Sequence, residues 1–235
     1  MTGSGQFGER AFAVVFDLDD TLFPERDYFF SGILAAEQWI VPTHGINGFG
    51  EAARAAFLRG RRGHAFDEAL DEIAPGRRDE LMPGLLAAYR ANKPKLVLQP
   101  DVRALLERMR PHAFLALASD GRLQGQQDKV DALGLAPLFD HIRLTDSWGR
   151  DFWKPHPRAC EEVMTLCPLG EPSHYVFVGD NPAKDFHSPV RLGWRSIRVQ
   201  YFDNRPVPPG GCEAETKAAT LAGLQETLRS FGIPF

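Results

Sequence analysis

The sequence has little of several features that would place it in a special class. Its three cysteines, Cys160, Cys167 and Cys212, show no CxxC spacing, so neither a disulfide framework nor a cysteine zinc site is expected. Its 27 lysines and arginines are outnumbered by 31 acidic residues, which gives no basic face for nucleic acid. No apolar run approaches the ~18 residues that cross a bilayer. We therefore expect a cytoplasmic protein with a small-molecule partner, and neither a nucleic acid nor a membrane partner.

The length and the chain start set further bounds. With 235 residues, the chain is long enough for one full core and a small accessory domain. The segment Met1 to Glu9 is small and polar, so it predicts a frayed tail and not a signal peptide. Proline and glycine in Asn204 to Gly211 predict a surface loop before the last helix.

Short apolar runs alternate with helical patterns through most of the chain. This alternation predicts an α/β fold, a Rossmann-like parallel sheet with helices on both faces. The predicted strands are Ala11 to Phe16, Ala113 to Ala118, His141 to Thr145, Tyr175 to Val178 and Ser196 to Val199. The predicted helices are Asp101 to Arg110, Gly121 to Leu133, Pro157 to Leu166, Pro182 to Leu192 and Leu221 to Ser230. Right-handed crossovers would gather Asp17, Ser119, Asp146 and Asp180 at one rim of this sheet.

The alternation is interrupted from Pro24 to Lys95, where helical segments are separated by glycine and proline. This stretch predicts a small inserted all-helical cap domain over residues 24–95, with the Rossmann-like catalytic core formed by residues 1–23 and 96–235. Because the insertion leaves the core beside the predicted rim, it is expected to act as a lid. Its aromatic side chains are expected to form the cap core, and the two nearest the rim, Phe23 and Tyr28, are candidates to touch substrate. The aromatic group is Phe23, Tyr28, Phe29, Phe30 and Trp39.

Four short segments carry the predicted chemistry. They are Asp17 to Thr21, Ser119 to Gly121, Lys154-Pro155, and Gly179 to Asp185. Asp17 and Asp19 follow an apolar strand two residues apart, so one carboxylate can attack a substrate while the other moves a proton. Together the four segments supply what phosphoryl transfer through an aspartyl-phosphate needs. In this reading Asp19 protonates the leaving oxygen and then activates water against the phosphoenzyme.

Attack of a carboxylate on a phosphate requires a cation that screens both charges. Magnesium prefers oxygen ligands and commonly takes one or two carboxylates, with waters and substrate phosphate completing its shell. The predicted ligands are Asp17, Asp180 and the main-chain carbonyl of Asp19. Asp185 is expected to orient water or Lys154, and Asn181 is a weaker candidate for the metal or for the Asp19 side of the site.

The remaining candidates would contact the phosphate. Lys154 adds a positive charge beside the nucleophile. The Ser119 hydroxyl, with backbone N–H groups at Gly121 and the following helix start, can donate to a phosphate oxygen. Thr21 is expected either to bond the Asp17 carboxylate or to cap the following turn. Asp120 puts a negative charge near the phosphate, so it either points away or faces a positive or hydroxyl-rich group of the substrate.

The four segments, in this order and at these strand ends, resemble those of the haloacid dehalogenase superfamily. The insertion after the first strand resembles the helical cap of phosphoglycolate phosphatase-like members. The resemblance implies that Asp17 is the nucleophile and Asp19 the general acid and base. It also implies phosphate contacts from Ser119 and Lys154, and magnesium held by Asp180 with support from Asp185. Members that cleave carbon–halogen bonds typically lack the second aspartate, so the presence of Asp19 favours phosphate-ester hydrolysis over dehalogenation.

The predicted function is a magnesium-dependent phosphomonoester hydrolase that acts on a small phosphorylated metabolite, with a sugar phosphate favoured. Three alternatives stay open: a nucleoside 5'-monophosphatase, a sugar-phosphate mutase, and a non-catalytic binding or interaction domain. A mutase would require the cap to keep water from the phosphoenzyme.

Overall fold

The structure is a computed structural model that describes residues 10–202 and 206–235. The predicted tail Met1–Glu9 and the first two residues of the predicted loop from Asn204 lie outside the described residues. The chain divides into two compact units, one of Met1–Pro24 with Val97–Phe235 and one of Glu25–Leu96. Each unit is described by itself below.

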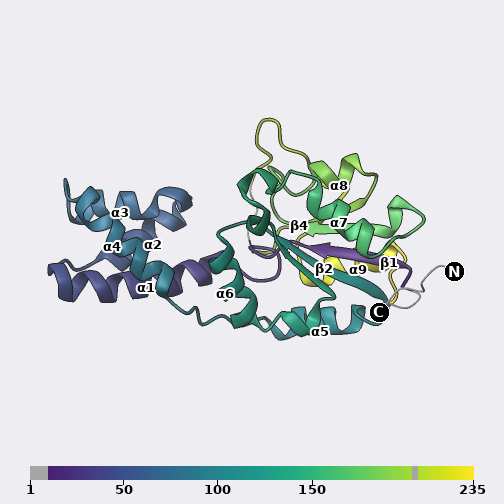
Figure 1. The fold of residues 1–235 in the computed structure, drawn as a ribbon, viewed down its shortest axis with the longest axis horizontal. Helices are drawn as coiled ribbons and strands as arrows, with labels where there is room; N and C mark the ends of the chain where they lie inside the picture. The colour runs from purple at the N-terminus through teal and green to yellow at the C-terminus, as the bar shows by residue number, and fades with distance from the viewer. Residues whose placement is uncertain (1–9, 203–205) are drawn as a thin grey trace. The chain divides into compact units, whose positions relative to one another are not determined.

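The larger unit is built on a six-stranded parallel sheet with strand order β3-β2-β1-β4-β5-β6 (Figure 1). The strands are β1 (Phe12–Phe16), β2 (Ala113–Ser119), β3 (His141–Leu144), β4 (Tyr175–Gly179), β5 (Arg195–Val199) and β6 (Thr216–Ala218). The α/β prediction is confirmed by this sheet. Strand β6 was not predicted, because three residues with one buried side chain carry no apolar run.

Helices cover both faces of the sheet, with α7 and α8 on one side and α5 and α9 on the other (Figure 1). The helices of this unit are α5 (Pro100–Met109), α6 (Leu123–Leu133), α7 (Arg158–Leu166), α8 (His187–Arg191) and α9 (Leu221–Ser230). Short 3-10 helices span Ala136–Leu138, Thr145–Trp148, Arg150–Phe152 and Pro172–His174. Because both faces are covered, every residue of β2 and β4 is buried, which explains why these strands are mostly apolar.

One predicted helix is mostly absent. The stretch Pro182 to Leu192 was expected to be helical, yet the only helix within it, α8, spans five residues. Local side-chain bonds hold the first part in turns: the Asn181 amide oxygen accepts from the Ala183 N–H at 3.0 Å, and the Asp185 carboxylate accepts from the Asn181 N–H at 2.8 Å. Such bonds offer the backbone an alternative to helix, and here they place Asp185 at the end of β4.

The smaller unit is a bundle of α1 (Glu25–His44), α2 (Phe49–Leu58), α3 (Ala65–Ile73) and α4 (Arg78–Ala91), with a 3-10 turn at Arg62–His64. Its core is rich in aromatic rings, as in the stacking of Phe29 on Phe57 at 4.4 Å between centroids. Phe30 and Trp39 pack against the same core, and the Tyr28 ring meets Tyr89 at 6.0 Å. Phe23 was wrongly expected in this group. It belongs to the larger unit, where the turn after β1 buries its ring.

A hydrogen-bonded tyrosine joins β4 to the loop before it. The Tyr175 hydroxyl donates to the Cys167 carbonyl at 2.8 Å and accepts from the Leu169 N–H at 2.6 Å. Tyr175→Phe should lower the free energy of unfolding by about 1–3 kcal/mol, because the buried Cys167 carbonyl and the partly buried Leu169 N–H both lose their partner. Urea unfolding would measure this, and a loss below about 0.5 kcal/mol would show that the loop finds other partners.

Candidate active site

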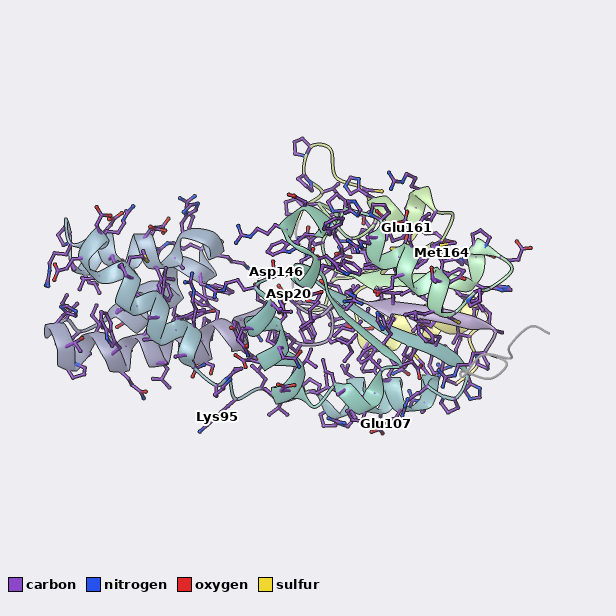
Figure 2. All side chains as sticks on the ribbon, in the orientation of Figure 1. Asp20, Lys95, Glu107, Asp146, Glu161 and Met164 are labelled. Atoms are coloured by element: carbon purple, nitrogen blue, oxygen red, sulfur yellow. The ribbon has the colours of Figure 1, made fainter. Side chains whose placement is uncertain are left out.

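The strand register brings the predicted rim residues together. Phe16 at the end of β1 pairs with Leu117 of β2 and with Val178 of β4, and the Asp17 N–H donates to the Val178 carbonyl at 2.9 Å. The next residues of these strands therefore place Ser119 and Asp180 on either side of Asp17. In Figure 2 the labelled Asp20 and Asp146 lie at this end of the sheet. Strand β1 has β2 on one side and β4 on the other, so Asp17 stands where the strand order reverses, the usual ligand position of such folds.

Two lysines surround the Asp17 carboxylate. Lys154 Nζ lies 2.5 Å from Asp17 Oδ1 and 2.8 Å from Asp185 Oδ1, and all three side chains are at most 6% exposed. Lys184 Nζ lies 4.0 Å from Asp17 Oδ2 and 3.7 Å from Asp120 Oδ2. The peptide bond between Lys154 and Pro155 is cis. The site thus places two lysines beside three buried carboxylates, those of Asp17, Asp120 and Asp185.

The ionisation of these groups follows from burial and from their neighbours. Burial raises the pKa of Asp17, but the charges of Lys154 and Lys184 and the hydrogen bond from Lys154 outweigh it, so the pKa lies below its ordinary value. Burial and the charge of Asp17 leave the pKa of Asp185 above its ordinary value. Burial lowers the pKa of Lys154, yet the carboxylates of Asp17, Asp185 and Asp120 bring it well above its ordinary value. Asp17 is therefore ionised and Lys154 is a cation.

Three carboxylates form a group of the kind that holds a divalent cation. Ligand oxygens of Asp17, Asp180 and Asp185 all lie within 4.8 Å of one another, and all three residues are buried. Asp180 follows β4 directly, and its main-chain carbonyl accepts from the buried Arg198 guanidinium at 3.2 Å. Carboxylate oxygens are hard donors of the kind that magnesium prefers. The sequence placed Asp185 only in support of the metal site, whereas the structure puts its carboxylate close enough to the other two to share one ion with them.

Two buried hydroxyls at the rim have no hydrogen-bond partner among residues 10–202 and 206–235, namely Thr21 Oγ1 and Ser119 Oγ. Buried polar groups are normally paired, so such hydroxyls call for a ligand. A hydrogen bond from the segment after β5 holds the loop that contains Thr21, because the Tyr201 hydroxyl donates to the Thr21 carbonyl at 2.9 Å. Asp20 in this loop has a φ of 54°, a left-handed conformation that aspartate tolerates better than most residues.

Asp120 points into the protein. Its Oδ1 accepts from the Thr145 hydroxyl at 2.7 Å and from the Lys154 N–H at 3.1 Å, while Lys184 lies near its other oxygen. Gly121 follows with a φ of 132°, and a Cβ there would lie 2.4 Å from Gln126 Nε2. Asp120 and Gly121 therefore shape the loop after β2, and Asp120 also holds the Lys154 backbone through its N–H.

Two other predicted residues, Asn181 and Asp146, make hydrogen bonds that hold nearby loops. Asn181 uses its side-chain oxygen to cap the turn at Ala183. Asp146 accepts from the Leu123 N–H at 3.0 Å and from Trp153 Nε1 at 3.1 Å, so it ties the start of α6 to the loop that leads to Lys154.

Asp19 has partners that the sequence did not suggest. Both its oxygens lie within 2.8 Å of Lys129 Nζ, and Gln126 Nε2 donates to Oδ2 at 3.0 Å. Lys129, Gln126 and Lys184 were all missed. Lys184 lies inside a predicted segment, directly before Asp185, and so could have been chosen. Lys129 and Gln126 lie on a helix more than 100 residues from Asp19, where only the fold brings them near.

A family model described as haloacid dehalogenase-like hydrolase matches residues 13–188, which contain all four predicted segments. Two curated relatives are both named glyceraldehyde 3-phosphate phosphatase. The protein from Methanopyrus kandleri is 25% identical over 83% of this chain and 87% of its own length. The protein from Methanocaldococcus jannaschii is 24% identical over 79% of this chain and 83% of its own length.

Solved structures show the same fold. A superfamily hydrolase of subfamily IA from Geobacter sulfurreducens has a TM-score of 0.67 at 20% identity, covering 95% of this chain and 99% of its own. A magnesium-bound hydrolase of the same superfamily from Bacillus subtilis, described as revealing interdomain movement, has a TM-score of 0.64 at 19% identity and covers 96% of this chain and 100% of its own. Within the described residues, no helix combines the length and apolarity needed to span a membrane.

Proposed function

The chain belongs to the haloacid dehalogenase-like hydrolases, and from this premise we propose that it is a magnesium-dependent phosphatase of small phosphorylated metabolites. Family membership confirms the expected superfamily and makes the chain an enzyme, a hydrolase, so the alternative of a non-catalytic binding domain is set aside. One observation carries the proposal: the buried, ionised Asp17 carboxylate lies against Lys154 and within a group of three carboxylates that fits a divalent cation.

Each residue then has a role in phosphoryl transfer. The Asp17 carboxylate attacks phosphorus, and the ester oxygen leaves with a proton from Asp19. Asp19 next takes a proton from water, which attacks the aspartyl-phosphate and releases phosphate. Lys154 faces the charge that develops on the phosphoryl oxygens, and the unpartnered hydroxyls of Ser119 and Thr21 can donate to them.

Asp17, Asp180 and Asp185, with the main-chain carbonyl of Asp19, would hold the magnesium ion. When bound, the ion supplies positive charge that neutralises the phosphate and allows one anion to approach another. Without the metal ion, the positive charge of Lys154 offsets part of the negative charge of Asp17 and Asp185.

A sugar phosphate or similar small metabolite is the favoured substrate class. The support is that both curated relatives described above carry the name of a three-carbon sugar phosphate phosphatase. A nucleoside 5'-monophosphate and a mutase reaction are the runners-up. The helical unit at residues 25–96 is proposed to act as a cap of the phosphoglycolate phosphatase-like kind, and the enzyme is proposed to work in the cytoplasm without nucleic acid or membrane.

The test is the release of inorganic phosphate by the purified chain from para-nitrophenyl phosphate and from a panel of sugar phosphates and nucleotides. A sugar phosphate should give the highest kcat/KM. Conversion of a sugar phosphate into its isomer without phosphate release would identify a mutase instead. Absence of turnover across the whole panel would contradict the proposed function.

Removal of divalent cations should lower turnover by ~10²-fold or more, because the cation contributes several kcal/mol to transition-state stabilisation. Magnesium should restore activity after chelation. Calcium should restore little, since it takes more ligands at longer distances than magnesium. Full activity in excess chelator would exclude a metal role for the three carboxylates.

A further inference from the structure

We propose that Lys129 and Gln126 are positioning residues, which hold the Asp19 carboxyl in the orientation that its proton transfers require. This inference rests on the proposed function, in which Asp19 is the general acid and base. It assigns a role to two side chains of helix α6 that the proposed function does not use.

The contacts form a fixed cradle on one carboxylate. Lys129 Nζ lies 2.7 Å from Asp19 Oδ1 and 2.8 Å from Oδ2, a bidentate approach by a side chain that is 5% exposed. Gln126 Nε2 donates to Oδ2 at 3.0 Å. The Asp19 side chain itself is 18% exposed, so one part of it stays open to a reacting group.

The two donors are themselves held in place. Gln126 and Lys129 stand three residues apart in α6, so they share one face of the helix. The Gln126 amide also donates to the Asp120 carbonyl at 2.6 Å, and the Lys129 ammonium lies 6.0 Å from the centre of the Phe23 ring. A buried lysine in such a setting is not a solvated surface charge, because it has little freedom to leave its partner.

The cradle can keep one Asp19 oxygen in place through both proton transfers. In the first, the proton on the Asp19 carboxyl passes to the ester oxygen while its carbonyl oxygen keeps accepting from the donors. In the second, the carboxylate takes a proton from water, and the electron pair of the water oxygen forms the new bond to phosphorus. General acid and base catalysis depends on this geometry, since the donor must reach the reacting oxygen within a hydrogen-bond distance.

The two half-reactions allow the inference to be tested with Lys129→Met. Para-nitrophenolate leaves without a proton, so phosphorylation of Asp17 by para-nitrophenyl phosphate should stay near the native rate. Attack of water needs Asp19, so steady-state turnover should fall by ~10²-fold. The variant should therefore show a rapid burst of para-nitrophenolate, then slow turnover, and acid quench should trap more phosphoenzyme than in the native protein. The leaving group of glyceraldehyde 3-phosphate needs a proton. With this substrate the variant should therefore also lose the rapid formation of phosphoenzyme.

A double-mutant cycle separates positioning from a structural role. If Lys129 acts through Asp19, then Lys129→Met should have little further effect in an Asp19→Asn background. Lys129→Arg should recover part of the rate because a guanidinium can also pair with both oxygens. Gln126→Met should give a smaller loss, and Gln127→Met is the matched control with native rates, since the Gln127 amide lies on the exposed side of α6 and donates to Asp131. Thermal unfolding of each variant checks the fold.

Native turnover in Lys129→Met, or parallel loss of burst and turnover with no rescue by arginine, would overturn the inference while leaving the phosphatase function intact. Additive losses in the cycle with Asp19→Asn would overturn it too. If the native chain turned over no substrate of the panel, both the proposed function and this inference would fall.

Discussion

Asp17→Asn should lower phosphate release by at least ~10⁴-fold, equivalent to roughly 5 kcal/mol in the activation free energy. The amide oxygen is a poor nucleophile, and the charge that would bind a cation is lost with it. The fold should survive, because Lys154 keeps its ion pair with Asp185 at 2.8 Å. Acid quench of this variant should trap no phosphoenzyme. A variant that only slows the attack of water would still form phosphoenzyme that acid quench can trap.

The matched control for this substitution is Asp146→Asn. It makes the same change after β3, two strands away from β1 in the sheet, where the carboxylate accepts from the Leu123 N–H and the Trp153 indole. Its activity should stay far above that of Asp17→Asn. An Asp17→Asn protein that is folded and retains a tenth of native turnover would mean that another group attacks the phosphate.

The sequence predicted the sheet because each central strand is an apolar run bounded by turn residues. Five strands and the segments at their ends are found, and the inserted stretch is helical. The predicted helix from Pro182 failed because side-chain bonds of Asn181 and Asp185 compete with helix formation, a local geometry that composition does not reveal.

The site was predicted to the extent that its residues follow strand ends. Asp17, Ser119 and Asp180 meet because parallel strands end at one edge. The partners of those residues could not be read in the same way. The approach of Lys129 to Asp19, and the turn of Asp120 toward Thr145, depend on which face of a helix or loop meets the rim. That choice is made by tertiary packing, which a single sequence does not show.

Lys154→Met should cost ~10²–10³-fold in kcat/KM, the usual effect of removing one donor from a site that stabilises developing negative charge. The Lys154 ammonium lies 2.5 Å from Asp17 and 2.8 Å from Asp185, so its loss leaves two buried carboxylates without their shared counter-ion. Breaking such a buried pair costs about 3–5 kcal/mol, so the variant should also unfold at a lower temperature. Magnesium should recover part of this stability, because it can take over the screening of Asp17 and Asp185.

Lys184→Met is the control that separates the position of Lys154 from charge alone. Lys184 is also a cation near Asp17, but it lies 4.0 Å away and its side chain is 26% exposed, so its removal should cost less in both rate and stability. Lys154→Arg keeps the charge but replaces a compact ammonium by a larger, planar guanidinium. Because the Lys154 side chain is buried, this variant should recover less than full activity. Activity and thermal unfolding, each with and without magnesium, measure these effects. Equal losses in Lys154→Met and Lys184→Met would mean that net charge decides the rate, since the contact distance of Lys154 would then contribute nothing of its own.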